Sequence, residues 1–353
     1  MSGAATQERN PWLNPKVLRS AREWRGRTVE EAATKIDKRP EDIVAWETNS
    51  GAAPTVRQAR ILAEFYGRAF LEFFLPELPV VPLPTLVPDY RMQAGVTPPT
   101  ENRELQAIQQ WAETQRLNAL GLLDDLGEKA PQIPQALFKT LSSDASEAAK
   151  AAREAIKFSI QDQISLTKSQ ADGLPNILRR KFETLGILTL KDPDLKELGV
   201  RGICIAVSPL PIIVFRNEAP SAQAFTLAHE LAHVITKQSG ITGHRSVEYD
   251  GSPVEKWADK FAAAFLMPAE QIEAVFDNRP ALPADSISNE HLNRLAEIFR
   301  VSPHAMLIRL VHLGYVRSSY YWQIKKPQFD ADEREYRSFA RARYYGSRYR
   351  SWL

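Results

Sequence analysis

Two histidines and a glutamate lie within one five-residue stretch of this 353-residue chain, His229-Glu230-Leu231-Ala232-His233. Apolar residues at helical spacing surround the stretch and predict a helix from Ala222 to Lys237, with Gly240 following as its stop. Histidines four residues apart lie on one face of a helix, so both imidazoles can reach a single metal ion. Glu230 points to the side of this pair, where its carboxylate can take a proton from a water without binding the metal.

Histidines on a helix can also cap or pack without binding any metal. Burying three ionisable side chains in an apolar helix is costly, however, unless a metal or polar partners compensate. Cys204 is the only cysteine, which excludes a disulfide framework and a thiolate metal cluster and is typical of a reducing compartment. A metal site here must therefore use His, Asp or Glu, a ligand set that is more often catalytic than structural.

A catalytic zinc ion needs a third protein ligand and an open position for water. The downstream candidates are His244, Glu248, Asp250, Glu255 and Asp259. The last two lie four residues apart in a predicted amphipathic helix that begins near Val254 and ends at Pro268. The apolar stripe of that helix would pack on the first helix and bring Glu255 to the metal. Asp259 could then hydrogen-bond an imidazole, or it could be a solvated or capping carboxylate.

Hydrolysis by a metal-activated water would also need an electrophile that stabilises the oxyanion. His244 and Tyr249 lie between the two helices and could serve, although loop residues of these types are often only surface groups. Just before the first helix, the segments Gly202 to Val207 and Ile212 to Phe215 predict a β-hairpin. We expect the strand Ile212 to Phe215 to offer a free edge that pairs with an extended peptide.

Residues 13 to 75 predict short helices separated by tight turns. Thr28 and Glu31 have the spacing of a capping box, and Pro40 suits the first position of the next helix. That helix is expected to bury Ile43 and Trp46. A helix, a short turn and a second helix in this order match the helix-turn-helix shape.

Base reading by a helix-turn-helix uses the first residues of the second motif helix. Here these positions hold two acids and three apolar residues: Pro40, Glu41, Asp42, Val44 and Ala45. Such residues read bases poorly, although Lys38, Arg39 and Arg57 could contact DNA phosphates. The sequence leaves DNA binding and a protein-docking or dimerisation role equally open.

Two sets of motifs carry a resemblance to known families. Residues 43–47 and 54–66 resemble the XRE-type, repressor-like helix-turn-helix module. Residues 225–233, 255–262 and 265–268 resemble the ImmA/IrrE family of zinc metallopeptidases, whose members often carry an XRE module and the phrase Phe-Phe-Leu-Pro-Glu. The similarity spans most of residues 13 to 316.

The ImmA/IrrE resemblance implies an activity and a site. It makes His229, His233 and Glu255 the ligands of one Zn²⁺ and Glu230 the catalytic base, in a thermolysin-like, gluzincin arrangement. It also implies a narrow substrate, typically a repressor or antitoxin-like protein, in a stress, mobile-element or toxin–antitoxin response. The alternative is a DNA-binding regulator or toxin–antitoxin component whose zinc site is not used for proteolysis.

The expected fold class is α+β and mostly α, with a small sheet beside the histidine-bearing helix. The expected segments are a helix-turn-helix domain (1–76), a Pro-rich linker (77–100), a helical segment (101–170), a metallopeptidase core (171–285) and a C-terminal helical region (286–353). Residues 317–353 carry nine basic and four acidic side chains interleaved with aromatic ones. This tail could bind nucleic acid or form a packed amphipathic helix.

The net charge of +2 gives no overall drive toward nucleic acid or membrane. The first thirty residues lack a signal-peptide core, and no apolar run of about 18 residues occurs. We therefore expect a cytoplasmic protein without a membrane partner. The sequence does not fix the oligomeric state, and a dimer is one option.

Overall fold

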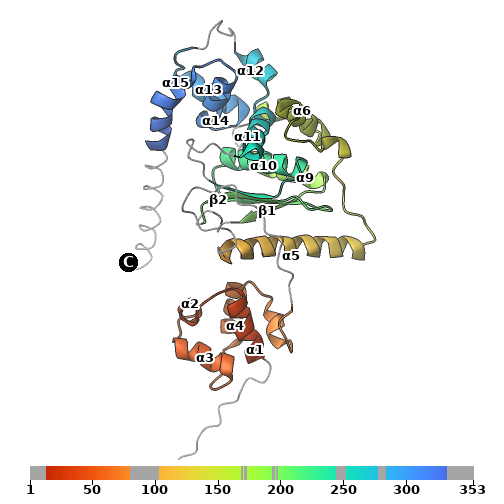
Figure 1. Ribbon diagram of the computed structural model, residues 1–353, viewed down its shortest axis with the longest axis vertical. Coiled ribbons are helices and arrows are strands. Elements are labelled where there is room, and N and C mark those ends of the chain that lie inside the picture. Colours follow the sequence, from red (N-terminus) through yellow and green to blue (C-terminus); the bar gives the residue numbers. More distant parts are fainter. Residues whose placement is uncertain are drawn as a thin grey trace, which may run out of the picture. The chain divides into compact units, whose positions relative to one another are not determined.

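The computed structural model describes residues 13–79, 103–167, 170, 173–192, 195, 198–243, 252–276 and 284–331. The chain divides into two compact units, Met1–Leu86 with Ala94–Ala119, and Val87–Gln93 with Leu120–Leu353. Helices predominate, and the second unit contains a four-stranded sheet (Figure 1), which confirms the predicted fold class. None of the described helices is long and apolar enough to cross a membrane.

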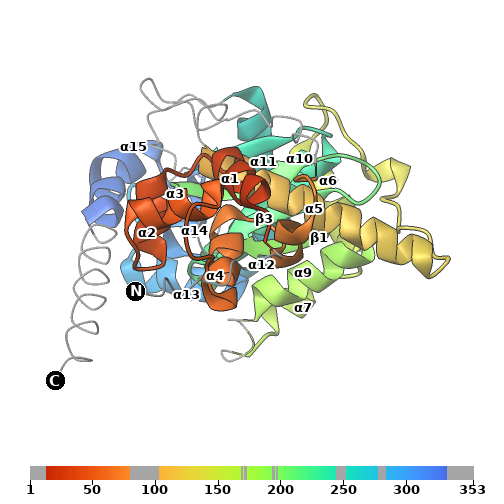
Figure 2. The same ribbon diagram turned by 90° about the horizontal axis from the view of Figure 1, so that it is seen from below.

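The first unit contains short helices that share one small core, together with the amino-terminal part of a longer helix (Figure 2). They are α1 (Pro15–Trp24), α2 (Val29–Lys35), α3 (Pro40–Thr48), α4 (Val56–Tyr66), the 3₁₀ helix η1 (Phe70–Phe74) and the start of α5 (Arg103–Asp125). The predicted capping box opens α2: the backbone N–H of Thr28 donates to Glu31, and that of Glu31 donates to the Thr28 hydroxyl. Ile43 and Trp46 are buried, as predicted.

The second unit packs helices on a mixed sheet. Its helices are η2 (Gln135–Leu137), α6 (Ala145–Ala155), α7 (Ile160–Ile164), α9 (Leu174–Thr184), α10 (Pro220–Ile235), α11 (Pro253–Leu266), α12 (Ala269–Val275), α13 (Asn289–Phe299), α14 (Pro303–His312), α15 (Ser318–Tyr320) and the π-helical η4 (Tyr321–Lys325). Its strands are β1 (Leu188–Asp192), β2 (Val200–Ile205), β3 (Ile212–Arg216) and β4 (Gly240–Gly243).

The sheet confirms the predicted hairpin but not the predicted free edge. The strand order is β1-β3-β2-β4, and β2 runs antiparallel to both β3 and β4. β3 also pairs in parallel with β1, so it lies inside the sheet and has no edge for a peptide. The expectation for Ile212 to Phe215 was therefore wrong. All four of these residues are buried, which is typical of a strand covered on both faces.

One hydrophobic core joins the parts of the second unit. α10 lies against β2, β3 and α9, and α11 packs between α10 and α6 (Figure 1). Each of the stretches 133–158, 174–272 and 287–321 contributes buried residues to this core. The predicted helical segment and C-terminal region thus contribute to the same core as the predicted metallopeptidase segment. Most of the predicted linker and part of the tail lie outside the described residues.

The carboxyl end of α11 is held by buried polar side chains. Arg153 donates to the carbonyl of Phe265 at 2.8 Å, and Gln163 donates to that of Leu266 at 3.0 Å. Arg309 donates to the carbonyl at position 267, also at 3.0 Å. The last turn of a helix lacks intrahelical partners for its carbonyl groups. These three side chains supply such partners and fix the position of α11 against its neighbours.

Candidate metal centre

The two predicted histidine ligands meet on one face of α10. His229 and His233 are buried, and their Nε2 atoms lie 3.2 Å apart. α10 is apolar around most of its circumference and begins at Pro220, which suits the first helical position. The helix therefore carries both imidazoles into the core of the second unit.

Glu255 completes a cluster of three potential ligands. It lies in the first turn of α11, where the Ser252 hydroxyl accepts a hydrogen bond from its backbone N–H. Its Oε2 lies 3.5 Å from His229 Nε2, and its Oε1 lies 3.0 Å from His233 Nε2. Zinc bonds of about 2.0–2.1 Å at tetrahedral angles separate the ligand atoms by roughly 3.3–3.4 Å. The observed separations fit a single zinc ion.

Asp259 lies one turn after Glu255, on the outer side of the cluster. Its Oδ1 is 2.9 Å from His229 Nδ1, and its side chain is partly exposed. A proton on Nδ1 that is donated to this carboxylate leaves Nε2 of His229 as the acceptor atom facing the cluster. The structure thus brings Asp259 into the contact expected of a residue that orients a ligand.

Charges in the cluster are strongly coupled in the metal-free chain. Burial alone would lower the pKa of His229, but hydrogen bonds with Asp259 and Glu255 outweigh it and raise that pKa to about 10. Burial alone would raise the pKa of Glu255, yet hydrogen bonds from His229 and His233 hold it well below its usual range. The cluster therefore attracts positive charge, whether a proton or a metal cation.

Glu230 is fully buried beside the three potential ligands. Its Oε1 accepts a hydrogen bond from the hydroxyl of Thr242 on β4, and its Oε2 has no hydrogen-bond partner among the described residues. Burial raises the pKa of the Glu230 carboxyl, against the opposing effect of His233 and His229. The oxygen that is left without a partner could accept a proton from a group placed beside the cluster.

Two further residues touch this carboxylate and were not predicted. Thr242 gave no signal in the sequence, because nothing local shows what a single threonine contacts. Gly202 gave a weak signal in the sequence, since an isolated glycine inside a strand often marks a close approach by another group. Among the other predicted residues, His244, Glu248, Tyr249 and Asp250 lie outside the described residues.

Comparison with known families covers both units. Residues 183–311 match a peptidase family model described as the IrrE N-terminal-like domain, and residues 18–73 match a helix-turn-helix model. The chain combines an IrrE N-terminal-like domain with a helix-turn-helix domain. The first match supports a metallopeptidase, and the second suggests DNA binding. No curated protein matches the chain.

The IrrE-like domain contains the whole cluster, because α10, β4 and α11 all lie within residues 183–311. Two histidines outside the cluster make other contacts in the same unit. His304 stacks on Phe329 and hydrogen-bonds the Tyr321 hydroxyl, and His291 lies against Phe276. The described part of this domain thus holds one group of histidines and carboxylates with metal-ligand spacing.

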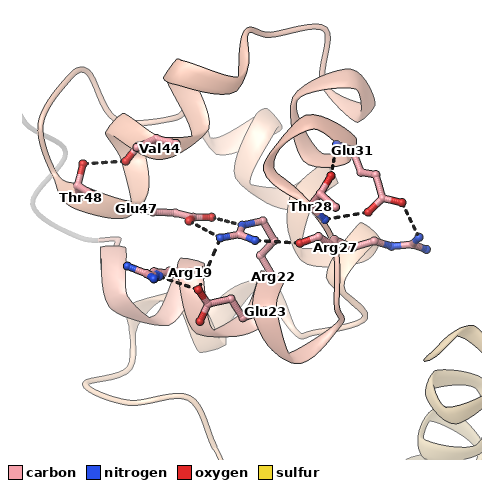
Figure 3. A network of polar contacts seen from close by, with 9 residues as sticks. All are labelled: Arg19, Arg22, Glu23, Arg27, Thr28, Glu31, Val44, Glu47 and Thr48. Carbon is pink, nitrogen blue, oxygen red and sulfur yellow. Dashed lines mark hydrogen bonds and ion pairs between the residues drawn. The ribbon is translucent and has the colours of Figure 1, made fainter. Parts of the chain in front are cut away.

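Several polar groups of the helix-turn-helix domain bond to one another (Figure 3). Arg22 and Glu47 form a buried bidentate pair, with N–O distances of 2.7 and 2.8 Å, and this hydrogen bonding raises the pKa of Arg22. Thr48 on α3 donates to the carbonyl of Val44. The predicted DNA contacts lie at the surface: Lys38, Arg39 and Arg57 are exposed, and Arg39 lies 3.4 Å from Asp42.

Proposed function

We propose that this chain is a zinc-dependent endopeptidase of the gluzincin type. The observation that carries the proposal is the convergence of His229, His233 and Glu255, whose ligand atoms lie 3.0 to 3.5 Å apart beside the buried carboxylate of Glu230. The match of residues 183–311 to a peptidase family supports the same conclusion. One zinc ion per chain would be held by the two Nε2 atoms and the Glu255 carboxylate.

Each residue has a defined task in this proposal. Bound zinc would polarise the scissile carbonyl and make water a better nucleophile near neutral pH. Glu230 Oε2 accepts the proton of the attacking water, and the carboxyl then delivers that proton to the leaving amine. Asp259 keeps the proton of His229 on Nδ1 and so presents Nε2 to the metal.

The proposed substrate is a specific regulatory protein in the cytoplasm, of the repressor or antitoxin type. Its cleavage would switch on a stress, mobile-element or toxin–antitoxin response. Two features support this: the resemblance to ImmA/IrrE peptidases, and the helix-turn-helix domain on the same chain. That domain would bring the peptidase to DNA or to a DNA-bound protein.

A second candidate is a DNA-binding regulator whose zinc site is not used for proteolysis. The match of residues 18–73 to a helix-turn-helix model favours it. In that case loss of the Glu230 carboxylate would leave the biological effect intact, because only zinc binding and DNA contact would matter.

The Glu230→Gln variant of the full chain separates the two candidates. The amide keeps the shape of the side chain but cannot take a proton, so we expect zinc content to stay the same while cleavage is lost. Affinity capture with this variant isolates the substrate. The captured protein is then exposed to the wild type, and mapping of its new termini identifies the cleavage site. Glu297→Gln, an exposed carboxylate on α13, is the matched control. An unchanged biological effect of Glu230→Gln would contradict the peptidase.

A further inference from the structure

We propose that Thr242 and Gly202 are positioning residues that hold the carboxylate of Glu230 from the side of the sheet. This inference rests on the proposed role of Glu230 as the base. The helix α10 alone fixes only where the Glu230 side chain begins. The position of the carboxylate three bonds further out depends on what it contacts.

The Thr242 hydroxyl is the first of these contacts. Thr242 is buried on β4, and its Oγ1 donates to Glu230 Oε1. The same hydroxyl lies 3.2 Å from the carbonyl oxygen of Gly202. A hydrogen bond to a buried carboxylate is stronger than one at the surface, because the surrounding dielectric is low. It directs one carboxylate oxygen toward the sheet and leaves Oε2 for the reaction.

The backbone of β2 at Gly202 is the second contact. A Cβ added at this position would lie 2.2 Å from Glu230 Oε1 and 2.7 Å from its Cδ. The backbone of Gly202 is not in the left-handed region, so its conformation does not require glycine. What requires glycine here is the Glu230 side chain, which lies directly on the strand.

Thr242 and Gly202 act as a pair because they are opposite each other in the sheet. The register of β2 and β4 aligns Gly202 with Thr242, next to an irregularity between Val200 and Gly202. A slip of one residue would turn Thr242 to the other face of the sheet. Bulges of this kind often aim a side chain near an active site. The sheet thus holds the Glu230 carboxylate through residues that are not among the proposed metal ligands.

The absorption spectrum of the cobalt(II)-loaded full chain tests whether Thr242 and Gly202 position the Glu230 carboxylate. The spectrum responds to groups that form hydrogen bonds near the metal. We would compare the wild type with Glu230→Gln, Thr242→Val and Gly202→Ala. Thr242→Ser restores the hydroxyl, and Thr189→Val removes a buried strand hydroxyl that donates elsewhere, to Glu183. Metal content and circular dichroism confirm that each variant is folded and loaded.

We expect Glu230→Gln, Thr242→Val and Gly202→Ala to shift the cobalt spectrum in the same direction at full metal content. Thr242→Ser and Thr189→Val should match the wild type. With a substrate in hand, Thr242→Val should lower kcat about 10- to 100-fold at unchanged KM, as for a misplaced catalytic group.

Two other outcomes would contradict the inference, and they differ in what they mean for the proposed function. If Glu230→Gln shifts the spectrum while Thr242→Val and Gly202→Ala both match the wild type, the positioning role is overturned and the proposed function stands. If Glu230→Gln itself leaves the spectrum unchanged, Glu230 does not act beside the metal, and the proposed function fails together with the inference.

Discussion

The candidate metal centre and the helix-turn-helix domain both bury ionisable side chains, but those side chains have different kinds of partner. In the helix-turn-helix domain, Arg22 and Glu47 satisfy each other through two hydrogen bonds. In the IrrE-like domain, His229, His233 and Glu255 converge on one point with a fourth ionisable group, Glu230, beside them. A saturated buried pair supports a fold, whereas converging ligand atoms are arranged for something that they bind.

The same contrast extends to the surfaces. α3, the second helix of the motif, contains no Arg, Lys, Asn, Gln or His, the side chains that most often read purines. Its exposed stripe is Glu41, Val44 and Thr48. Residues 13–79 hold eleven basic and ten acidic side chains, so the domain has little net charge to attract DNA. The IrrE-like domain therefore brings together side chains that could bind a ligand, whereas the helix-turn-helix domain has few side chains suited to reading DNA bases.

Removing a proposed ligand should have the largest effect. We expect His233→Ala to reduce zinc from about one ion per chain to nearly none, because two remaining ligands cannot hold a tetrahedral site. His304→Ala, which removes a histidine stacked on Phe329, is the control and should keep its zinc. Elemental analysis after dialysis measures both. Full zinc content in His233→Ala would mean that the cluster is not the zinc site, and the two domains would then not differ in this way.

Breaking the buried pair in the helix-turn-helix domain should come next. Glu47→Ala leaves the Arg22 guanidinium buried without its partner, which typically costs about 3–5 kcal/mol. Hydrogen exchange resolved by segment should show α1 and α3 losing protection while α10 and α11 keep theirs. The exposed Glu41→Ala is the matched control and should change protection little. Protection that survives Glu47→Ala would mean that the pair does not support this domain.

The contact between Asp259 and His229 should have an intermediate effect. Residues that orient a metal ligand typically contribute about 10- to 100-fold to metal affinity. We therefore expect Asp259→Asn to weaken zinc binding by about this factor without abolishing it, in competition with a chromogenic chelator. Asp285→Asn, an exposed carboxylate paired with Arg317, is the control. An unchanged affinity would assign Asp259 to the solvated surface.

The last prediction concerns the pH dependence of the stability of the metal-free chain, where the change over a single pH unit is small. The folded pKa of His229, about 10, lies above the unfolded value of about 6.5. The stabilisation from its protonation is thus present below pH 6.5 and is lost as the pH rises toward 10. Between these values it should fall by about 1.4 kcal/mol per pH unit. Chemical denaturation with a chelator present should show this slope in the wild type and lose it in His229→Gln.

Local patterns in the sequence predicted much of this molecule. The spacing of His229 and His233, the capping box at Thr28 and the helix that carries Glu255 all depend on neighbours within a few residues. Helix geometry fixes which of these nearby residues share a face, so their contacts can be predicted from the sequence without knowing the fold. The Glu255 contact needed one further step, the packing of one apolar stripe on another.

Contacts between distant strands could not be predicted in this way. β3 pairs with β1, which precedes it by about one strand and a loop, and nothing in residues 212–216 indicates on which side a partner lies. The position of the Glu230 carboxylate depends on the register of β2 and β4, which are separated in the chain by β3 and α10. Strand order and register are set by the whole sheet, and no single segment encodes them.

X-ray absorption at the zinc edge of the purified full chain tests the central claim most directly. We predict one zinc ion with light-atom ligands only, at about 2.0–2.1 Å, including the multiple scattering of two imidazoles. Glu230→Gln should keep this ligand set, and Glu255→Ala should lose it. A spectrum with fewer than two imidazoles, or the same spectrum in Glu255→Ala, would contradict the assignment of His229, His233 and Glu255 as the zinc site.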